Sequence, residues 1–141
     1  MLLNTENSES KPRKRCALYS RSATDSPEGK SIAGQLARLR DCASRFGWTV
    51  GGEYLDRAKQ GLSLKAQSML RLIDDAKAGK FEIILVTDLD RISRDVCDSH
   101  SFFQRMQFHD VEIYSLEDNA FISEMLVVFR SFQSSQYLKK R

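Results

Sequence analysis

Hydrophobic residues along the chain alternate between short continuous runs and spacings of three and four residues. The continuous runs predict strands at 16–19, 49–55, 81–86 and 111–116. The helical spacings predict amphipathic helices at 31–46, around 69–76 and around 96–106. This alternation predicts an α/β fold with a mainly parallel, four-stranded sheet flanked by helices.

Residues at the edges of these elements are typical of helix ends and buried strands. Ser31 precedes the first helix as its N-cap, and Gly47 and Gly79 follow the first two helices. The run at 81–86, FEIILV, is apolar on both faces after its first residues. Such a strand is expected in a parallel sheet that is covered by helices on both sides.

The C-terminal segment has a different pattern from the rest of the chain. Apolar residues from Phe121 to Phe132 recur at i, i+1, i+4, i+7, i+8 and i+11. The resulting stripe predicts a long amphipathic helix over 121–141, broad enough to face both its own domain and a partner. We therefore expect a homodimer or a higher homo-oligomer to form through this helix.

The other end of the chain, residues 1–14, is predicted to be a disordered polar and basic tail, which leaves 15–120 as one folded domain. With 41% hydrophobic and 29% charged residues among 141, the composition is that of a soluble globular protein. No apolar run approaches the roughly 20 residues of a membrane-spanning helix, and the first residues do not form a signal peptide. We therefore expect a cytoplasmic protein without a membrane partner.

Positive charge is concentrated at the two ends of the chain. Residues 1–15 carry a net charge of +2 and residues 139–141 carry +3, whereas the residues between them carry −2. A protein that binds nucleic acid by electrostatics alone spreads its positive charge over the fold. Contacts of this domain with phosphate are therefore expected to come from a few placed residues.

Three arginines follow predicted strands: Arg21 follows the first strand, and Arg91 and Arg94 follow the third. Ligands of parallel α/β sheets bind beyond the carboxyl ends of the strands, where these side chains would converge. Two interpretations remain open. The guanidinium groups surround a phosphodiester and stabilise the charge that grows in phosphoryl transfer, or each of them pairs with a nearby aspartate at the surface.

The remaining polar residues predict no metal and no other cofactor. Asp88 and Asp90 form a DxD pair, but no further carboxylate cluster or Gly-rich phosphate loop accompanies them. Three cysteines without a CxxC pair exclude a disulfide framework and a zinc knuckle. A receiver-like phospho-acceptor domain would use Asp88, but it needs an acidic pair after the first strand, where this chain has Ser20 and Arg21.

Four segments of the chain form a recognisable series. They are Tyr19-Ser20-Arg21, Ser31-Ile32-Ala33-Gly34-Gln35, Asp56, and the run DRISRD from Asp90 to Asp95 after LVTDL. In order and spacing they resemble the N-terminal catalytic domain of serine recombinases, the family of resolvases, invertases and larger integrases. The resemblance covers about residues 15–118, and it implies a four-stranded parallel sheet, a long dimerisation helix and DNA as the partner.

Proteins of this family cut DNA by attack of a serine hydroxyl on a phosphodiester and form a phosphoserine link to a 5′ end. They rejoin the strands without ATP or metal, because arginines supply the charge stabilisation that a metal would otherwise give. The resemblance therefore implies no cofactor. It implies a catalytic role for Arg21, Gln35, Asp90, Arg91 and Arg94.

The chain departs from the family at the position of the nucleophile. In the family pattern Tyr-x-Arg-x-Ser the serine follows the arginine by two residues, and here that position holds Ala23. The adjacent Ser22 is the candidate substitute. A strand would place Ser22 on the face opposite to Arg21, however, so Ser22 reaches the same site only if the strand turns there.

Other family positions are also changed. The loop after Asp56 usually carries a serine and later an Asp-Arg pair, which align here with Gln60 and Lys65-Ala66; Ser134-Ser135 replaces a Glu-Arg pair of the long helix. The chain ends at Arg141, within the helix that leads to a DNA-binding module in the family. We therefore expect a truncated recombinase domain with impaired catalysis, and whether it is an enzyme stays open. The alternative is a non-enzymatic interaction protein that pairs with itself or with an intact recombinase.

Overall fold

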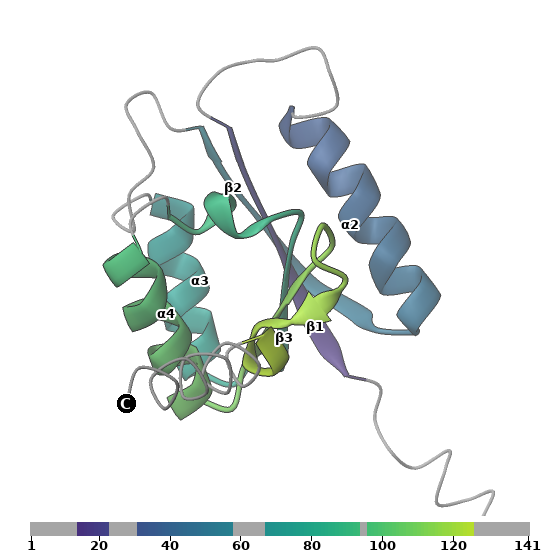
Figure 1. Ribbon diagram of the computed structural model, residues 1–141. Helices are drawn as coiled ribbons and strands as arrows, with labels where there is room; N and C mark the ends of the chain where they lie inside the picture. The colour runs from purple at the N-terminus through teal and green to yellow at the C-terminus, as the bar shows by residue number, and fades with distance from the viewer. Residues whose placement is uncertain (1–13, 23–30, 58–66, 94–95, 126–141) are drawn as a thin grey trace, which may run out of the picture.

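The computed structural model describes residues 14–22, 31–57, 67–93 and 96–125 (Figure 1). Within these ranges, the strands form a single sheet in the order β2-β1-β3-β4-β5. The strands are β1 (Arg15–Ser22), β2 (Thr49–Arg57), β3 (Ile83–Val86), β4 (Glu112–Ser115) and β5 (Ala120–Phe121). The pairs among β1 to β4 are parallel, and β5 is antiparallel to β4.

Helices cover both faces of this sheet. Figure 1 shows α2 (Ile32–Phe46) on one face, and α3 (Gln67–Lys77) and α4 (Val96–Phe108) on the other. A single turn of 3-10 helix, η1 (Leu89–Arg91), follows β3. None of the helices in the described ranges is both long and apolar enough to cross a lipid bilayer. The predicted α/β class, the mainly parallel sheet and the flanking helices are confirmed.

Each face of the sheet has its own hydrophobic core. Consecutive residues of β1 belong to different cores: Leu18 packs with Leu39 of α2, whereas Tyr19 packs with Met69 of α3 and Phe102 of α4. All four residues of β3 are buried. This strand therefore has the two-sided cover that its apolar sequence predicts.

Both ends of α2 form as their flanking residues predict. The Ser31 hydroxyl accepts a hydrogen bond from the Gly34 N–H at 3.2 Å, which makes Ser31 the N-cap. Gly47 ends the helix with a φ of 73°, in the left-handed region that glycine enters without strain. These local interactions set the length of α2 and therefore the position of the residues on its first turn.

The sheet has a fifth strand, which corrects the prediction of four. Ala120 and Phe121 pair with Ser115 and Tyr114, and residues 122–125 are helical, so the helix predicted from Phe121 begins one residue later. A strand of two residues shows no alternation, and its apolar residue also fits helical spacing. The remainder of the predicted helix 121–141 lies outside the described residues.

The strand order reverses between β1 and β3, which lie side by side in the sheet. The pairing of β1 with β2 continues to Ser22, whereas its pairing with β3 ends at Leu18. The last residues of β1 therefore adjoin the segment that follows β3, which includes η1. Ligand sites of parallel α/β sheets form at such reversals of strand order.

Candidate functional site

Arg21 lies at the carboxyl end of β1 and is almost completely buried, with 1% of its surface exposed. Its side chain is on the α3–α4 face of the sheet, as is that of Tyr19 two residues earlier. Nη1 of Arg21 donates to the Ile92 backbone oxygen at 3.4 Å, and Nε has no hydrogen-bond partner among the described residues. Because a guanidinium stays charged, Arg21 places a positive charge beneath this edge of the sheet.

Gln35 of α2 holds the backbone of Arg21. The Gln35 Nε2 donates to the Arg21 backbone oxygen at 2.9 Å, and the Gln35 Oε1 accepts from the Arg21 N–H at 3.1 Å. The pairing of β1 with β3 ends at Leu18, so Arg21 has no partner in β3. The two bonds to Gln35 hold the backbone of Arg21 beyond that point. Because Gln35 is 1% exposed, its amide is a fixed interior support that positions Arg21.

Arg91 is the second arginine at this edge of the sheet. Its Nη1 donates to the backbone oxygen of Arg21 at 2.9 Å, and its Nε donates to Oδ2 of Asp88 at 3.1 Å. The Thr87 hydroxyl donates to the same Asp88 oxygen at 3.2 Å. The side chains of Arg91 and Asp88 are 18% and 20% exposed. This ion pair therefore reaches solvent, whereas Arg21 beside it is buried.

Asp56 connects β2 to the first turn of α3. It is opposite Arg21 in the pairing of β1 with β2, and it is buried. Its Oδ2 accepts from the Tyr19 hydroxyl at 2.8 Å and from the Met69 N–H at 2.9 Å, and its Oδ1 accepts from the Ser68 N–H at 2.9 Å. The N–H groups of a first helical turn have no partner within the helix, and they favour a negative charge.

Tyr19 is a neutral donor rather than a base for this site. Burial raises the pKa of its hydroxyl above the ordinary value, and the nearby Arg21 charge lowers the same pKa in part. The net shift is upward, so the hydroxyl keeps its proton at neutral pH and donates it to Asp56. Tyr19 and Asp56 together fix the strand that carries Arg21 against α3.

The arrangement is suited to binding an anion. Arg21 and Arg91 come from different strand ends. The Arg91 guanidinium donates to the Arg21 backbone oxygen, and the Arg21 guanidinium donates to the backbone oxygen of Ile92, the residue after Arg91. Guanidinium groups match the geometry of phosphate and stabilise the charge that develops in phosphoryl transfer. In the described part of the chain, no three His, Cys, Asp or Glu residues lie close enough to hold a metal ion.

The structure brings three of the predicted site residues, Arg21, Gln35 and Arg91, together at the reversal of strand order. Asp90, for which the resemblance implies a catalytic role, is exposed. The carboxylate bonded to Arg91 is that of Asp88 instead. The 3-10 turn explains this, because Asp88 comes directly before η1 and Arg91 ends it.

Two other predicted positions, Ala23 and Arg94, lie outside the described residues. Ser22 is buried and is the last residue of β1, so the strand continues through this position. Side chains alternate between the two faces along a strand, so Ser22 lies on the same face as Leu18, which is the α2 face. Arg21 lies on the opposite face.

Two contacts of the site were not predicted from the sequence: the bond between Asp88 and Arg91, and the bonds of Asp56 to the first turn of α3. The spacing of three residues between Asp88 and Arg91 is a signal for their contact, since side chains three apart are neighbours in a helical turn. No comparable signal exists for Asp56. Its partner Ser68 is 12 positions away, and only the tertiary structure brings them together.

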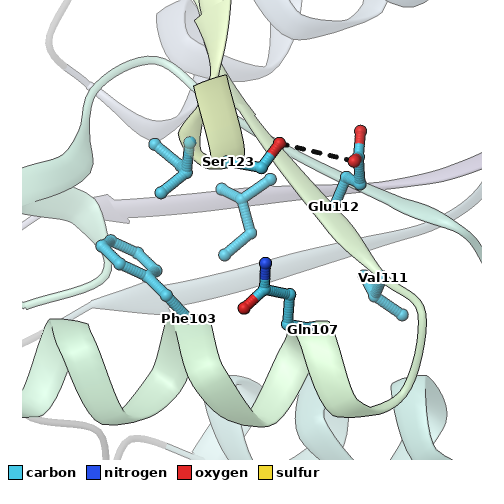
Figure 2. A pocket seen from close by; sticks show the side chains of 7 residues that line it. Phe103, Gln107, Val111, Glu112 and Ser123 are labelled. Carbon is cyan, nitrogen blue, oxygen red and sulfur yellow. Dashed lines mark hydrogen bonds between the residues drawn. The ribbon is translucent and has the colours of Figure 1, made fainter. Parts of the chain in front are cut away.

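A small pocket lies apart from the arginines, between α4 and β4. Figure 2 shows it lined by Phe103 and Gln107 of α4, by Val111 and Glu112, and by Ser123, whose hydroxyl donates to Glu112 at 3.4 Å. Its volume of about 30 Å³ is small for a ligand site. Because no arginine lines this pocket, we do not include it in the candidate site.

Comparisons with known proteins relate the chain and its fold to one family. Residues 16–138 match the family model described as "Resolvase, N terminal domain". The N-terminal catalytic domain of TP901-1 integrase is 28% identical with a TM-score of 0.75, over 91% of this chain and 100% of that chain. A resolvase family site-specific recombinase from Streptococcus pneumoniae is also 28% identical with a TM-score of 0.69, over 92% of this chain and 91% of that one.

A more distant structure shares the fold. The C-terminal catalytic domain of ISC1926 TnpA, an IS607-like serine recombinase, is 20% identical with a TM-score of 0.65, over 90% of this chain and 85% of that one. None of the curated proteins compared with the chain matches it significantly.

Proposed function

The chain belongs to the resolvase N-terminal domain family, and we propose that it is a serine recombinase catalytic domain that binds DNA through a degenerate active site. In this proposal the guanidinium groups of Arg21, Arg91 and Arg94 bind a DNA phosphate. Gln35 positions Arg21, and Asp90 assists the arginines from the same loop. The chemistry needs no metal and no other cofactor, since guanidinium groups stabilise the phosphate charge.

The convergence of Arg21 and Arg91 is the observation that carries the proposal. The two side chains come from positions 70 residues apart in the chain, yet Arg91 donates to the backbone of Arg21 at 2.9 Å. A buried, charged Arg21 with an unpaired Nε is costly unless it serves a ligand, because buried polar groups are normally hydrogen-bonded. An oxyanion at this edge would satisfy it.

The degeneracy rests on Ala23, which stands where the family has its nucleophilic serine. Alanine has no hydroxyl and cannot form a phosphoserine link. The course of β1 argues against Ser22 as the substitute, since the strand continues through Ser22 and alternation directs it away from Arg21. We therefore propose that the chain binds its DNA without cleaving it efficiently.

A covalent-adduct assay tests this proposal. The full chain, fused to a sequence-specific DNA-binding domain, is expected to form no covalent protein–DNA adduct on a crossover site within the time in which an active family member, in the same fusion, cleaves that site. Denaturing gel electrophoresis of labelled DNA measures the adduct. If the unmodified chain forms an adduct, Ser22 or Thr24 acts as the nucleophile, and the proposed degeneracy is wrong.

We further propose a division of the chain into a basic tail (1–14), a catalytic domain (15–120) and a dimerisation helix (121–141). The apolar stripe of the last segment supports self-association, and the DNA-acting family supports a cytoplasmic location. The same stripe supports the alternative function, a non-enzymatic protein that pairs with itself or with an intact recombinase.

Self-association through this segment predicts a change in mass. The double variant Phe129→Ser, Phe132→Ser is expected to lower the molar mass in light scattering by about half, because it removes two aromatic side chains from the stripe. The matched control is Gln133→Ser, Gln136→Ser, which makes the same new residue at polar positions and should keep the mass. A wild-type chain that is monomeric at high micromolar concentration would contradict the prediction.

A further inference from the structure

In the described part of the chain, Asp88 is the carboxylate that is bonded to Arg91. One of its oxygens, Oδ2, accepts two hydrogen bonds, from Arg91 Nε at 3.1 Å and from the Thr87 hydroxyl at 3.2 Å. The backbone supports the same geometry, since the Arg91 N–H donates to the Asp88 carbonyl oxygen at 3.2 Å. Asp88 is therefore held in place as a partner of Arg91.

This contact changes the charge that an incoming anion meets. Without Asp88, Arg21 and Arg91 would present two positive charges, whereas the ion pair leaves a local charge of about +1. The Asp88 carboxylate also occupies Nε, one of the donors with which a guanidinium forms a two-pronged bond to phosphate. An anion that approaches Arg91 must then compete with an oxyanion that belongs to the protein.

The exposure of the pair shows that this competition can take place. Arg91 and Asp88 are 18% and 20% exposed, so a soluble anion can reach Arg91 without unfolding η1. Arg21 is 1% exposed and stays in place beneath them. An anion from solution can therefore replace Asp88 as the partner of Arg91.

We propose that Asp88 is an internal counter-ion that weakens the binding of phosphate to Arg91 and so sets the affinity of the arginine site. This inference rests on the proposed function, because it assumes that the site binds phosphate. It goes beyond that function in assigning the strength of binding to one side chain. Asp88 here regulates Arg91 and does not itself touch the substrate.

The variant Asp88→Asn tests the proposal with inorganic phosphate as the probe. Asparagine keeps the size and one acceptor oxygen of aspartate but removes the charge. We expect the dissociation constant of the full chain for phosphate to fall about fivefold, the factor that corresponds to a partly exposed ion pair. The titration is followed by NMR at the arginine Nε–Hε resonances. Asp88→Ser, which removes the charge with a different side chain, should shift the constant in the same direction.

Glu117→Gln is the matched control. Glu117 is an exposed carboxylate at the same edge of the sheet, where its N–H donates to the Thr87 backbone oxygen. It has no bond to Arg91 in the described structure, so loss of its charge should change the phosphate affinity by less than twofold. A thermal melt of each variant shows whether it is folded.

The unmodified chain provides a test that needs no variant. Saturating phosphate should move the Arg91 Nε–Hε resonance, because the Asp88 partner is exchanged for phosphate. An Arg91 resonance that stays unmoved while phosphate binds elsewhere at the site would overturn the inference.

The outcomes separate this inference from the proposed function. If neither Arg21→Gln nor Arg91→Gln weakens phosphate binding, the site does not bind phosphate and the proposed function fails. If both weaken it but Asp88→Asn leaves the affinity unchanged, only the counter-ion role fails. If Asp88→Asn lowers the affinity, Asp88 orients Arg91 toward phosphate, and the proposed sign is wrong.

Discussion

The double variant Ala23→Ser, Ala66→Arg, fused to a sequence-specific DNA-binding domain, is expected to form a covalent protein–DNA adduct about 10²–10³-fold faster than Ala23→Ser alone. Serine at position 23 restores the hydroxyl that the family pattern has two residues after Arg21, but the arginine that the family pattern has at the position aligned with Ala66 is still missing. Loss of one donor to the transition-state charge typically costs that factor. The rate is measured from the time course of adduct formation on labelled crossover-site DNA.

The fusion removes DNA targeting as a limiting step, since the body of the chain is net negative. The matched control is Ala23→Ser, Ala78→Arg, which adds a guanidinium at an exposed position after α3 and should cleave no faster than the single variant. Equal rates for the single and the Ala66→Arg double variants would mean that Lys65 or another residue already supplies the charge. The role assigned to position 66 would then be wrong.

Asp56→Ala is expected to lower the free energy of unfolding by about 3 kcal/mol. The substitution removes a buried carboxylate that accepts three hydrogen bonds, and it leaves the Tyr19 hydroxyl and the N–H groups of Ser68 and Met69 without that partner. Each hydrogen bond to a charged group contributes about 1.5–3 kcal/mol, and part of this loss is recovered where water replaces the carboxylate. Urea denaturation followed by circular dichroism measures the change.

Two further variants separate this effect from a general loss of negative charge. Asp56→Asn keeps an acceptor oxygen and should cost about 1 kcal/mol less than Asp56→Ala. Asp74→Ala removes an exposed carboxylate of α3 and should change the stability by less than about 0.5 kcal/mol. A cost below about 1 kcal/mol for Asp56→Ala would show that its carboxylate does not hold α3 to the sheet.

The parts of the fold that local interactions determine could be predicted from the sequence. Ser31 and Gly47 lie at the ends of α2, because the hydroxyl cap and the left-handed glycine act within one helical turn. A buried strand was predicted over 81–86 for a similar reason, since its residues are apolar on both faces, and the structure has it at Ile83–Val86. The strand β5 was missed because two residues carry no periodicity.

The candidate site was predictable only in part. The approach of Arg21 and Arg91 follows from their positions after adjacent parallel strands, and the structure has them linked by a hydrogen bond. The pairing of Asp88 with Arg91 depends on the direction of a single 3-10 turn, and no hydrophobic pattern indicates that direction. The three bonds of Asp56 depend on how α3 docks, and docking is a tertiary property.

The link between β1 and the segment after β3 also has a consequence for biosynthesis. β1 is the first described strand to leave the ribosome. Arg21 can meet Gln35 early, but its contacts with Arg91 and Ile92 come from residues that are 70 and 71 positions later. Contacts so far apart form late, since the intervening loop must close first. Until α4 has also emerged, the face of β1 that carries Tyr19 lacks its packing against Phe102, and incompletely covered apolar strands are prone to aggregation. A stall in translation before residue 91 would therefore leave the arginine site without Arg91 and one face of β1 without the cover of α4.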